Sequence, residues 1–351
     1  MNDVYEKLAK HLDDLPTGFP ATDSGVELRI LKRLFLPREA AVATSLSMKP
    51  QPVSTIAKRL NEAEQDMAQL LESMSKKGLI IRSSRGAQNL YMAAQFLVGI
   101  WEYHVNDLDV ELIKDFNEYA PHLVNTQLNL KTKQIRVIPI SKSISAEMRI
   151  MPYEEAESII KEQSKIVVAP CICRREHQML GKGCDYPIES CLIFGGAAYF
   201  YEGNGIGRSI SGKEALEILN MGQEAGLVIQ PGNSQKPSNI CLCCSCCCQI
   251  LKSLKNLDHP AKIACANYYA EVNEEDCTAC GVCEERCQMD AITINDAAVI
   301  NTDRCIGCGL CVTTCDTQAI KLLAKDEAEK TIPPATLSET YMNIARERGK
   351  I

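Results

Sequence analysis

The sequence predicts an α+β protein built from several domains, and three observations support this prediction. The chain has 351 residues, which is more than a single domain of ordinary size holds. One cysteine motif occurs twice towards the C-terminus, at 277–287 and 305–315. The N-terminal third instead has the apolar periodicity of amphipathic helices. The two ends of the chain are therefore expected to fold separately.

The composition indicates metal or redox chemistry in a reducing compartment. The chain contains 19 cysteines, and its net charge of −7 argues against a nucleic-acid binder. The N-terminus, MNDVYEKLAKHLDD, lacks the apolar core of a signal peptide, and the longest apolar run, near 96–101, is too short to cross a bilayer. We therefore expect a cytoplasmic protein with no membrane span, in which dense cysteine indicates metal sites rather than disulfides.

Residues 1–100 are expected to form a domain of helices closed by a β-hairpin. VELRILKRLF is amphipathic, and VSTIAKRL and EAEQDMAQLLESMSKKGLI read as two helices joined at Asn61, with Ser54 as the cap of the first. IIRSSRGAQNLYMA follows as a hairpin with Arg85 and Gly86 at its tip. This order resembles a winged-helix domain, over about 70 residues.

The charge of the second helix disfavours DNA binding, because DNA contact needs basic residues on the inserted helix. Its acidic residues are Glu62, Glu64, Asp66 and Glu72. Its cations, Lys76 and Lys77, lie at the far end, where they complement the helix dipole. Four other cations leave some DNA contact open, namely Lys58, Arg59, Arg82 and Arg85. We expect protein docking or dimerisation instead, since a fold alone does not determine function.

Residues 101–165 are expected to connect the N-terminal domain to the cysteine-rich part of the chain. They contain a helical stretch of mixed charge, WEYHVNDLDVELIKDFNEYA, then a strand, IRVIPI, and a helix, PYEEAESIIKEQ.

Residues 166–265 are expected to form a central cysteine-rich α/β domain. KIVVA is a strand that leads directly into Pro170, and Ser211 begins a capped helix that ends at Gly226. LVIQ is a second strand, and GNGIGRS is interpreted as a turn rather than a phosphate-binding loop. This support would hold two cysteine loops.

The central domain has ten cysteines that we predict to be metal ligands: Cys171, Cys173, Cys184, Cys191, Cys241, Cys243, Cys244, Cys246, Cys247 and Cys248. The run ICLCCSCCCQ has too many thiols for one four-ligand site, so it feeds two sites or leaves thiols spare. The other four cysteines would supply the missing ligands. If the run is extended, Cys244, Cys246 and Cys248 lie on one face and Cys241, Cys243 and Cys247 on the other, whereas a tight loop would divide the thiols differently.

Three interpretations of these ten thiols stay open. Additional iron–sulfur clusters are favoured, because the neighbouring module is expected to carry clusters too. Structural zinc and free thiols for disulfide exchange are the alternatives. Arg174 and Arg175 either lower nearby thiol pKa values and offset cluster charge or form a solvated pair. His177 is expected on the surface, and Cys265 as a small buried hydrophobe.

The repeated motif has the spacing C-x2-C-x2-C-x3-C in both copies, 28 residues apart. A tetranuclear iron–sulfur cluster takes three thiolates from one tight loop and the fourth from the other repeat. This assigns Cys277, Cys280, Cys283 and Cys315 to one cluster, and Cys305, Cys308, Cys311 and Cys287 to the other. A pair of zinc knuckles is the alternative, although such sites usually separate two CxxC motifs by a longer gap.

Residues 270–323 closely resemble bacterial-type dicluster ferredoxins. The resemblance implies a ferredoxin-like dicluster domain of the βαββαβ type over 266–325, with two 4Fe–4S clusters. AITINDAAVIN would be its hairpin and AIKLL its last strand. One departure is plain: the family usually has proline after the last cysteine of each motif, and this chain has Gln288 and Asp316.

The ferredoxin-like segment is acidic, and a helical tail follows it over 326–351. Ten Asp and Glu against four Lys and Arg give residues 271–325 a net charge of 4 − 10 = −6. Such a surface suits docking on basic patches of redox partner proteins. A homodimer or a place in a larger complex stays open.

We therefore expect an electron-transfer iron–sulfur protein, either a ferredoxin-type relay or the electron-transfer subunit of a larger oxidoreductase. No catalytic residues are predicted, because the sequence has no Ser/His/Asp set, P-loop or flavin motif. One alternative is a redox-sensing transcriptional regulator that uses the winged-helix-like domain. Another is an oxidoreductase whose active centre is the central cysteine group. The combination loosely resembles other cysteine-rich, ferredoxin-bearing proteins of anaerobic bacteria.

Overall fold

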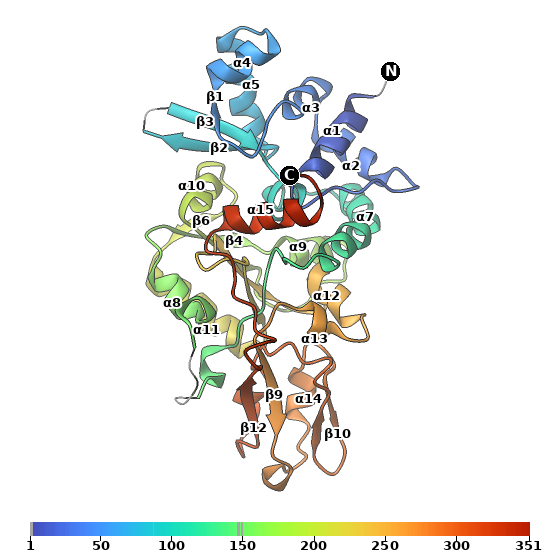
Figure 1. The fold of residues 1–351 in the computed structure, drawn as a ribbon, viewed down its shortest axis with the longest axis vertical. Coiled ribbons are helices and arrows are strands. Elements are labelled where there is room, and N and C mark those ends of the chain that lie inside the picture. Colours follow the sequence, from blue (N-terminus) through green and yellow to red (C-terminus); the bar gives the residue numbers. More distant parts are fainter. Residues whose placement is uncertain (1–2, 87, 146–147, 149) are drawn as a thin grey trace. The chain divides into compact units, whose positions relative to one another are not determined.

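The computed structural model describes the chain except for residues 1–2, 87, 146–147 and 149 (Figure 1). The chain divides into two compact units. The first comprises 1–131, 196–208 and 341–351, and the second comprises 132–195 and 209–340. The first unit thus contains the N-terminal segment expected at 1–100, part of the connector and two later stretches.

The first unit begins with helices and a small antiparallel sheet. Its first helices are α1 (Val4–Asp14), α2 (Val26–Leu34), α3 (Pro37–Ala43), α4 (Val53–Leu60) and α5 (Glu64–Lys76). The strands β1 (Gln51–Pro52), β2 (Ile80–Arg85) and β3 (Gln88–Ala93) pair in the order β1-β3-β2. The expected helix pair, joined at Asn61 with a φ of 53°, and the expected hairpin are present. Ser54 is not a cap, because α4 already begins at Val53.

Aromatic side chains form much of the core of the first unit. The connecting segment supplies α6 (Trp101–Tyr103) and α7 (Val110–Leu128), and Asp109 caps α7 through the N–H groups of the next turn. The rings of Trp101 and Phe116 stack with centroids 3.8 Å apart. Helix α10 (Gly195–Gly203) brings Phe200 to 4.8 Å from Tyr103.

The second unit contains a five-stranded sheet with the order β6-β4-β5-β8-β7. Its strands are β4 (Ile166–Pro170), β5 (Glu189–Phe194), β6 (Arg208–Ile210), β7 (Val228–Pro231) and β8 (Asn239–Cys243). The strands expected from KIVVA and LVIQ are therefore present. The prediction of a strand at IRVIPI is wrong, because this segment makes only two isolated bridges, from Ile135 to Gly232 and from Ile138 to Ile229.

Several helices accompany this sheet, and two of them, α9 and α12, begin next to a cysteine. They are α8 (Ala156–Lys161), α9 (Ile172–Met179), α11 (Gly212–Glu224), α12 (Gln249–Lys255) and α13 (Pro260–Ile263). Helix α11 packs over β4, β5 and β7, and the Ser211 hydroxyl accepts the Glu214 N–H at 3.1 Å, as expected of a cap. Cys171 lies at the start of α9 and Cys248 at the start of α12.

The segment after α13 has the element order expected from its sequence. Its elements are β9 (Tyr268–Val272), α14 (Val282–Arg286), β10 (Ile292–Ile294), β11 (Ala298–Ile300) and β12 (Ile320–Ala324). β9 pairs with β12 and β10 with β11, both antiparallel, and a short 3-10 turn at Val312–Thr314 stands where a second helix would be. The last helix, α15, spans Leu337–Glu347.

Candidate metal centres

Four of the eight cysteines in the repeated motif line one cavity between the two repeats. They are Cys277, Cys280 and Cys283 from the first motif and Cys315 from the second. Ile294, Ala298 and Ile320 supply apolar walls. The fourth thiol thus comes from the other repeat, as the spacing of the motifs predicts.

A second cavity holds the complementary set of cysteines. Cys305, Cys308 and Cys311 line it together with Cys287. Ala270, Ile292 and Ile300 are among its apolar walls. Each cavity thereby collects four thiols from two distant loops, which is the arrangement that a tetranuclear cluster requires.

Backbone N–H groups point at three of these sulfurs. Ala298 donates to the Sγ of Cys277 at 3.3 Å and Ala291 to that of Cys287 at 3.3 Å. Ala270 donates to the Sγ of Cys305 at 3.4 Å. Hydrogen bonds to ligand sulfur are among the features that tune the potential of an iron–sulfur cluster.

Burial makes some of the thiols that line the two cavities costly to ionise. It raises the pKa of Cys283 and Cys305, and it raises that of Cys308 to about 12. A buried thiolate needs a nearby positive charge, which bound iron supplies when a cluster is present. The residues therefore fit an iron–sulfur group in both cavities.

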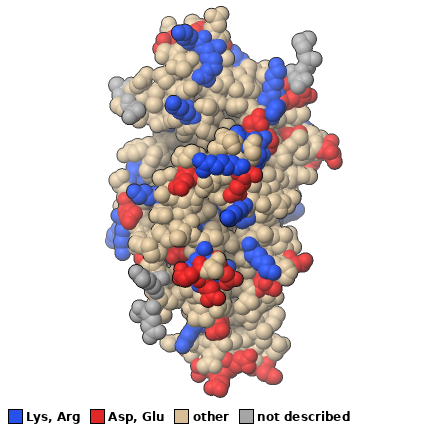
Figure 2. All heavy atoms as spheres, in the orientation of Figure 1, with Lys and Arg blue, Asp and Glu red and all other residues tan. Residues whose placement is uncertain are grey.

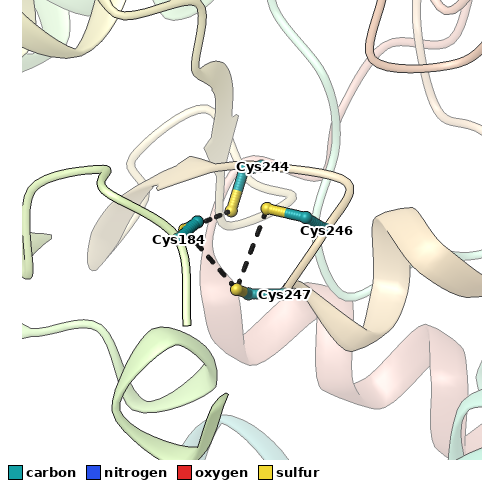
Figure 3. Close-up of side chains that lie close together, drawn as sticks. All are labelled: Cys184, Cys244, Cys246 and Cys247. Atoms are coloured by element: carbon teal, nitrogen blue, oxygen red, sulfur yellow. Dashed lines mark hydrogen bonds between the residues drawn. The ribbon is translucent and has the colours of Figure 1, made fainter. Parts of the chain in front are cut away.

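The ten central cysteines separate into two groups, and the first is a compact quartet. The Sγ atoms of Cys184, Cys244, Cys246 and Cys247 all lie within 4.8 Å of one another (Figure 3). Cys184 lies 3.6 Å from Cys247 and 4.0 Å from Cys244, and Cys246 lies 3.8 Å from Cys247. We call these four residues the thiol quartet.

The fold of the cysteine run explains this grouping. Strand β8 ends at Cys243, residues 245–247 form a turn, and the Cys248 N–H donates to the Cys244 carbonyl at 3.0 Å. Of the two arrangements considered for the run, the tight loop is therefore present, because the run is extended only up to Cys243. The turn sends Cys246 and Cys247 back towards Cys184.

The other six central cysteines gather at β5, β8 and the starts of α9 and α12. Cys191 and Cys241 are directly opposite in the β5–β8 pairing. Asn239 donates to the sulfur of Cys241 at 3.6 Å and Gln230 to that of Cys248 at 3.8 Å. We call this group the thiol sextet, whose members are Cys171, Cys173, Cys191, Cys241, Cys243 and Cys248.

Neighbouring thiols of the sextet perturb one another strongly. Hydrogen bonds from adjacent thiols lower the pKa of Cys171, Cys241 and Cys248. Hydrogen bonds to adjacent thiols raise the pKa of Cys173 and Cys243. Because adjacent buried thiols cannot all ionise without a compensating cation, a full set of thiolates here requires bound metal.

Arg174 supplies a fixed positive charge near both thiol groups. Its side chain is fully buried and donates to the carbonyls of Pro187, at 2.6 Å, and Leu242, at 2.5 Å. A hydrogen bond from Cys247, aided by the charge of Arg174, lowers the pKa of Cys244 to about 4. The solvated alternative is therefore wrong for Arg174, whereas Arg175 is half-buried.

Two side chains near the thiols, His177 and Cys265, lie in surroundings that differ from those expected. His177 is not a surface residue: it is 8% exposed, with Nδ1 2.8 Å from the Cys173 carbonyl and Nε2 3.4 Å from Lys252. Its backbone contact lies within α9 itself, four residues back along the helix. Cys265 is half-buried, and its Sγ lies 3.3 Å from the hydroxyl of Thr331.

One contact that was not expected from the sequence joins the repeated-motif segment to the cysteine run. The Gln288 Oε1 accepts the N–H of Ser245 at 2.8 Å and its hydroxyl at 3.0 Å, and the Gln288 Nε2 donates to the Gly226 carbonyl at 3.0 Å. Ser245 lies between two quartet cysteines, and Gln288 directly follows Cys287. The sequence does mark this position, because it has Gln288 where the resemblance to dicluster ferredoxins implies proline.

Comparison with known proteins identifies the class of the C-terminal segment. Residues 270–293 and 298–321 match the model of the 4Fe–4S binding domain family. The chain therefore carries a ferredoxin-type iron–sulfur module near its C-terminus, and this module and the many cysteines support an iron–sulfur electron-transfer role. The chain has no significant match among curated proteins or solved structures. No helix in the described part of the chain is long and apolar enough to cross a membrane.

Proposed function

We propose that the protein is an electron relay with two 4Fe–4S clusters in its C-terminal module and a further iron–sulfur centre at the thiol sextet. The observation that carries the proposal is that each cavity is lined by the four cysteines assigned to one cluster. When bound, such clusters supply one-electron transfer. The ligand sets are Cys277, Cys280, Cys283 and Cys315, and Cys305, Cys308, Cys311 and Cys287.

The contact through Gln288 supports a connection between these clusters and the central thiols. Gln288 follows Cys287, a ligand in our assignment, and binds Ser245. Cys243, a sextet member, precedes Ser245 by two residues. We therefore propose 266–325 as the cluster module and 166–265 as the domain that holds the next centre.

An exposed acidic surface on the iron–sulfur module supports the proposal of a redox partner with a basic docking surface. All ten Asp and Glu residues between 271 and 325 are exposed, and Figure 2 shows acidic side chains at the end of the view where Figure 1 labels β10 and β12. The two arginines of the module are directed inwards, since Arg286 binds the carbonyls of Gln223 and Glu224 and Arg304 binds that of Lys255. The exposed surface is thus left with little positive charge to weaken docking.

The regulator alternative has less support. Arg82 pairs with Glu72, and Arg59 donates to the carbonyl of Ser45 and, at 2.7 Å, to the amide of Gln51. Those cations are already engaged by the protein, so they are poorly placed to bind phosphate. We propose that the winged-helix-like segment docks a protein partner instead.

Electron paramagnetic resonance (EPR) of anaerobically purified, dithionite-reduced protein tests the relay. Two clusters close together give a spin-coupled spectrum, and Cys315→Ser is expected to perturb one cluster and leave the other's signal. Cys265→Ser is the matched control, because Cys265 lies outside both cavities. A wild-type protein without acid-labile sulfide would overturn the proposal.

A further inference from the structure

We propose that the thiol quartet binds a single zinc ion in tetrahedral geometry, and that this site is separate in kind from the thiol sextet. The proposal goes beyond the relay, which leaves the metal of the quartet open. The quartet would act as a structural clasp in the loop that joins the iron–sulfur module to the sextet.

The sulfur–sulfur distances carry the argument. A tetrahedral zinc ion with Zn–S bonds of about 2.3 Å places its sulfurs about 3.8 Å apart. Three of the six sulfur–sulfur distances in the quartet are 3.6, 3.8 and 4.0 Å, and the other three are no longer than 4.8 Å. A tetranuclear cluster binds each thiolate to a different iron, so its ligands stand further apart.

The iron–sulfur module provides an internal comparison. Its cysteines also come in fours, and each four lines a cavity. Among the residues that the structure describes, the quartet is the set of ligand atoms that lies within 4.8 Å of one another. The thiols of the module thus line cavities, which suits clusters, whereas the sulfurs of the quartet lie close together, which suits a single ion.

The ligand set also favours a structural site over a catalytic one. All four donors are thiols, and a zinc ion bound by four thiolates has no open position for water or substrate. Cys184 comes from the loop between α9 and β5, and the other three come from the segment 244–247 that directly follows β8. One ion would therefore fasten two segments that are about 60 residues apart.

Arg174 suits the charge of such a site. Zinc with four thiolates has a net charge of −2, which needs a nearby cation when it is partly buried. Arg174 is fully buried, and its Nε has no hydrogen-bond partner in the described part of the chain. Its other nitrogens hold Pro187 and Leu242, one on each of the two segments that the quartet joins.

The position of the quartet in the chain indicates what a bound metal ion would hold in place. The segment 244–247, which contains Cys244, Cys246 and Cys247, is flanked on both sides by sextet members, Cys243 and Cys248. Ser245, within the same turn, accommodates Gln288. A metal ion at the quartet would fix the spacing of the two flanking thiols and the surface on which the iron–sulfur module rests.

The test compares metal content and cobalt spectra of anaerobically prepared proteins. Wild type and Cys265→Ser are expected to contain about one zinc per chain, and Cys184→Ser to lose it while iron, sulfide and the reduced-cluster EPR signal persist. After metal exchange, Co²⁺ is expected to give the intense visible bands of a tetrahedral thiolate site in wild type but not in Cys184→Ser.

The outcomes separate this proposal from the relay. Zinc retained in Cys184→Ser, or a wild type without zinc whose Cys184→Ser variant loses iron and sulfide, would overturn the clasp and leave the relay intact. If Cys184→Ser does not fold, Cys184→His decides, because zinc accepts imidazole in place of a thiolate. Soluble Cys184→His protein with about one zinc supports the clasp, and the same protein without zinc overturns it.

Discussion

At the scale of single residues, Gln288 makes contacts that proline, which the resemblance to dicluster ferredoxins implies at this position, could not make. Proline at this position has no N–H and no polar side chain, whereas glutamine offers both an acceptor and two donors. Both ends of its amide are used, towards Ser245 and Gly226. The equivalent residue of the second repeat, Asp316, is exposed instead.

Replacing Gln288 is expected to weaken the attachment of the iron–sulfur module. Gln288→Ala removes hydrogen bonds to a half-buried N–H and a carbonyl, so the free energy of unfolding should fall by about 1–3 kcal/mol. Asp316→Ala is the matched control and should change it by less than about 0.5 kcal/mol. Anaerobic denaturant titrations would measure both, and equal effects of the two substitutions would contradict the role of Gln288.

At the scale of secondary-structure elements, two arginines fasten the iron–sulfur module to central helices. Arg286 donates to the last carbonyls of α11, and Arg304 donates to the carbonyls of Lys255 and Leu257 at the end of α12. The C-terminal carbonyls of a helix lack partners within the helix and carry partial negative charge, so a guanidinium suits them.

Removing one of these caps is expected to loosen the end of its helix. Arg304→Ala leaves three carbonyls without their charged donor, so we expect a loss of about 1.5–3 kcal/mol in local stability. Hydrogen exchange should accelerate at α12 and remain unchanged at α7. Lys321→Ala, at an exposed position on β12, serves as the control. Unchanged exchange at α12 in Arg304→Ala would rule out this account of the attachment.

An ion cluster in the first unit gives a prediction for pH. Asp13 lies 2.7 Å from Arg348 and 2.9 Å from Lys350. Burial acts to raise the pKa of Asp13, but the Phe19 N–H and the two cations together hold it below its usual value. The carboxylate therefore stabilises the fold above the unfolded-state pKa of about 3.9, and this contribution is lost as the pH falls through the lower folded-state value.

Acid titration of stability would test the ion cluster. Wild type should lose stability more steeply below about pH 4 than Asp13→Asn, which has no carboxylate to protonate. Because Asp13 is partly exposed, the difference is expected to be small. Parallel curves for the two proteins over this range would show that Asp13 does not contribute.

Local patterns predicted most of these elements, and long-range contacts account for the errors. The hairpin around Asn295 and the helix that begins after Ser211 depend on turn and cap residues that are adjacent in sequence. The segment at 135–140 has the apolar pattern of a strand, but it makes only isolated bridges to Ile229 and Gly232. The division of the ten thiols could not be predicted, because it depends on where Cys184 and Cys191 meet the run.

At the scale of the whole molecule, one chain carries three kinds of proposed metal site. The two cavities of the C-terminal module hold open sets of four thiols, the sextet surrounds the ends of β5 and β8, and the quartet closes on one point. The charged residues differ in place: the buried cation Arg174 lies among the central thiols, whereas the acidic residues of the module face solvent.

The exposed acidic residues should make partner reactions depend on salt. With a basic c-type cytochrome as a probe, the rate of electron transfer from the reduced protein should fall as ionic strength rises, because screening weakens steering. Replacing Glu284 and Glu285 with lysine should lower the rate at low salt. The same replacements at Glu62 and Glu64, in the first unit, are the control. A rate that rises with salt would contradict the docking surface.

The most direct test of the central claim is a count of iron, acid-labile sulfide and zinc per chain in strictly anaerobic protein. Two ferredoxin-type clusters account for about eight iron and eight sulfide. We predict more than about eight iron, from a further centre at the sextet, together with about one zinc at the quartet. About eight iron with no zinc would leave the central thiols without metal and contradict the account of both central sites.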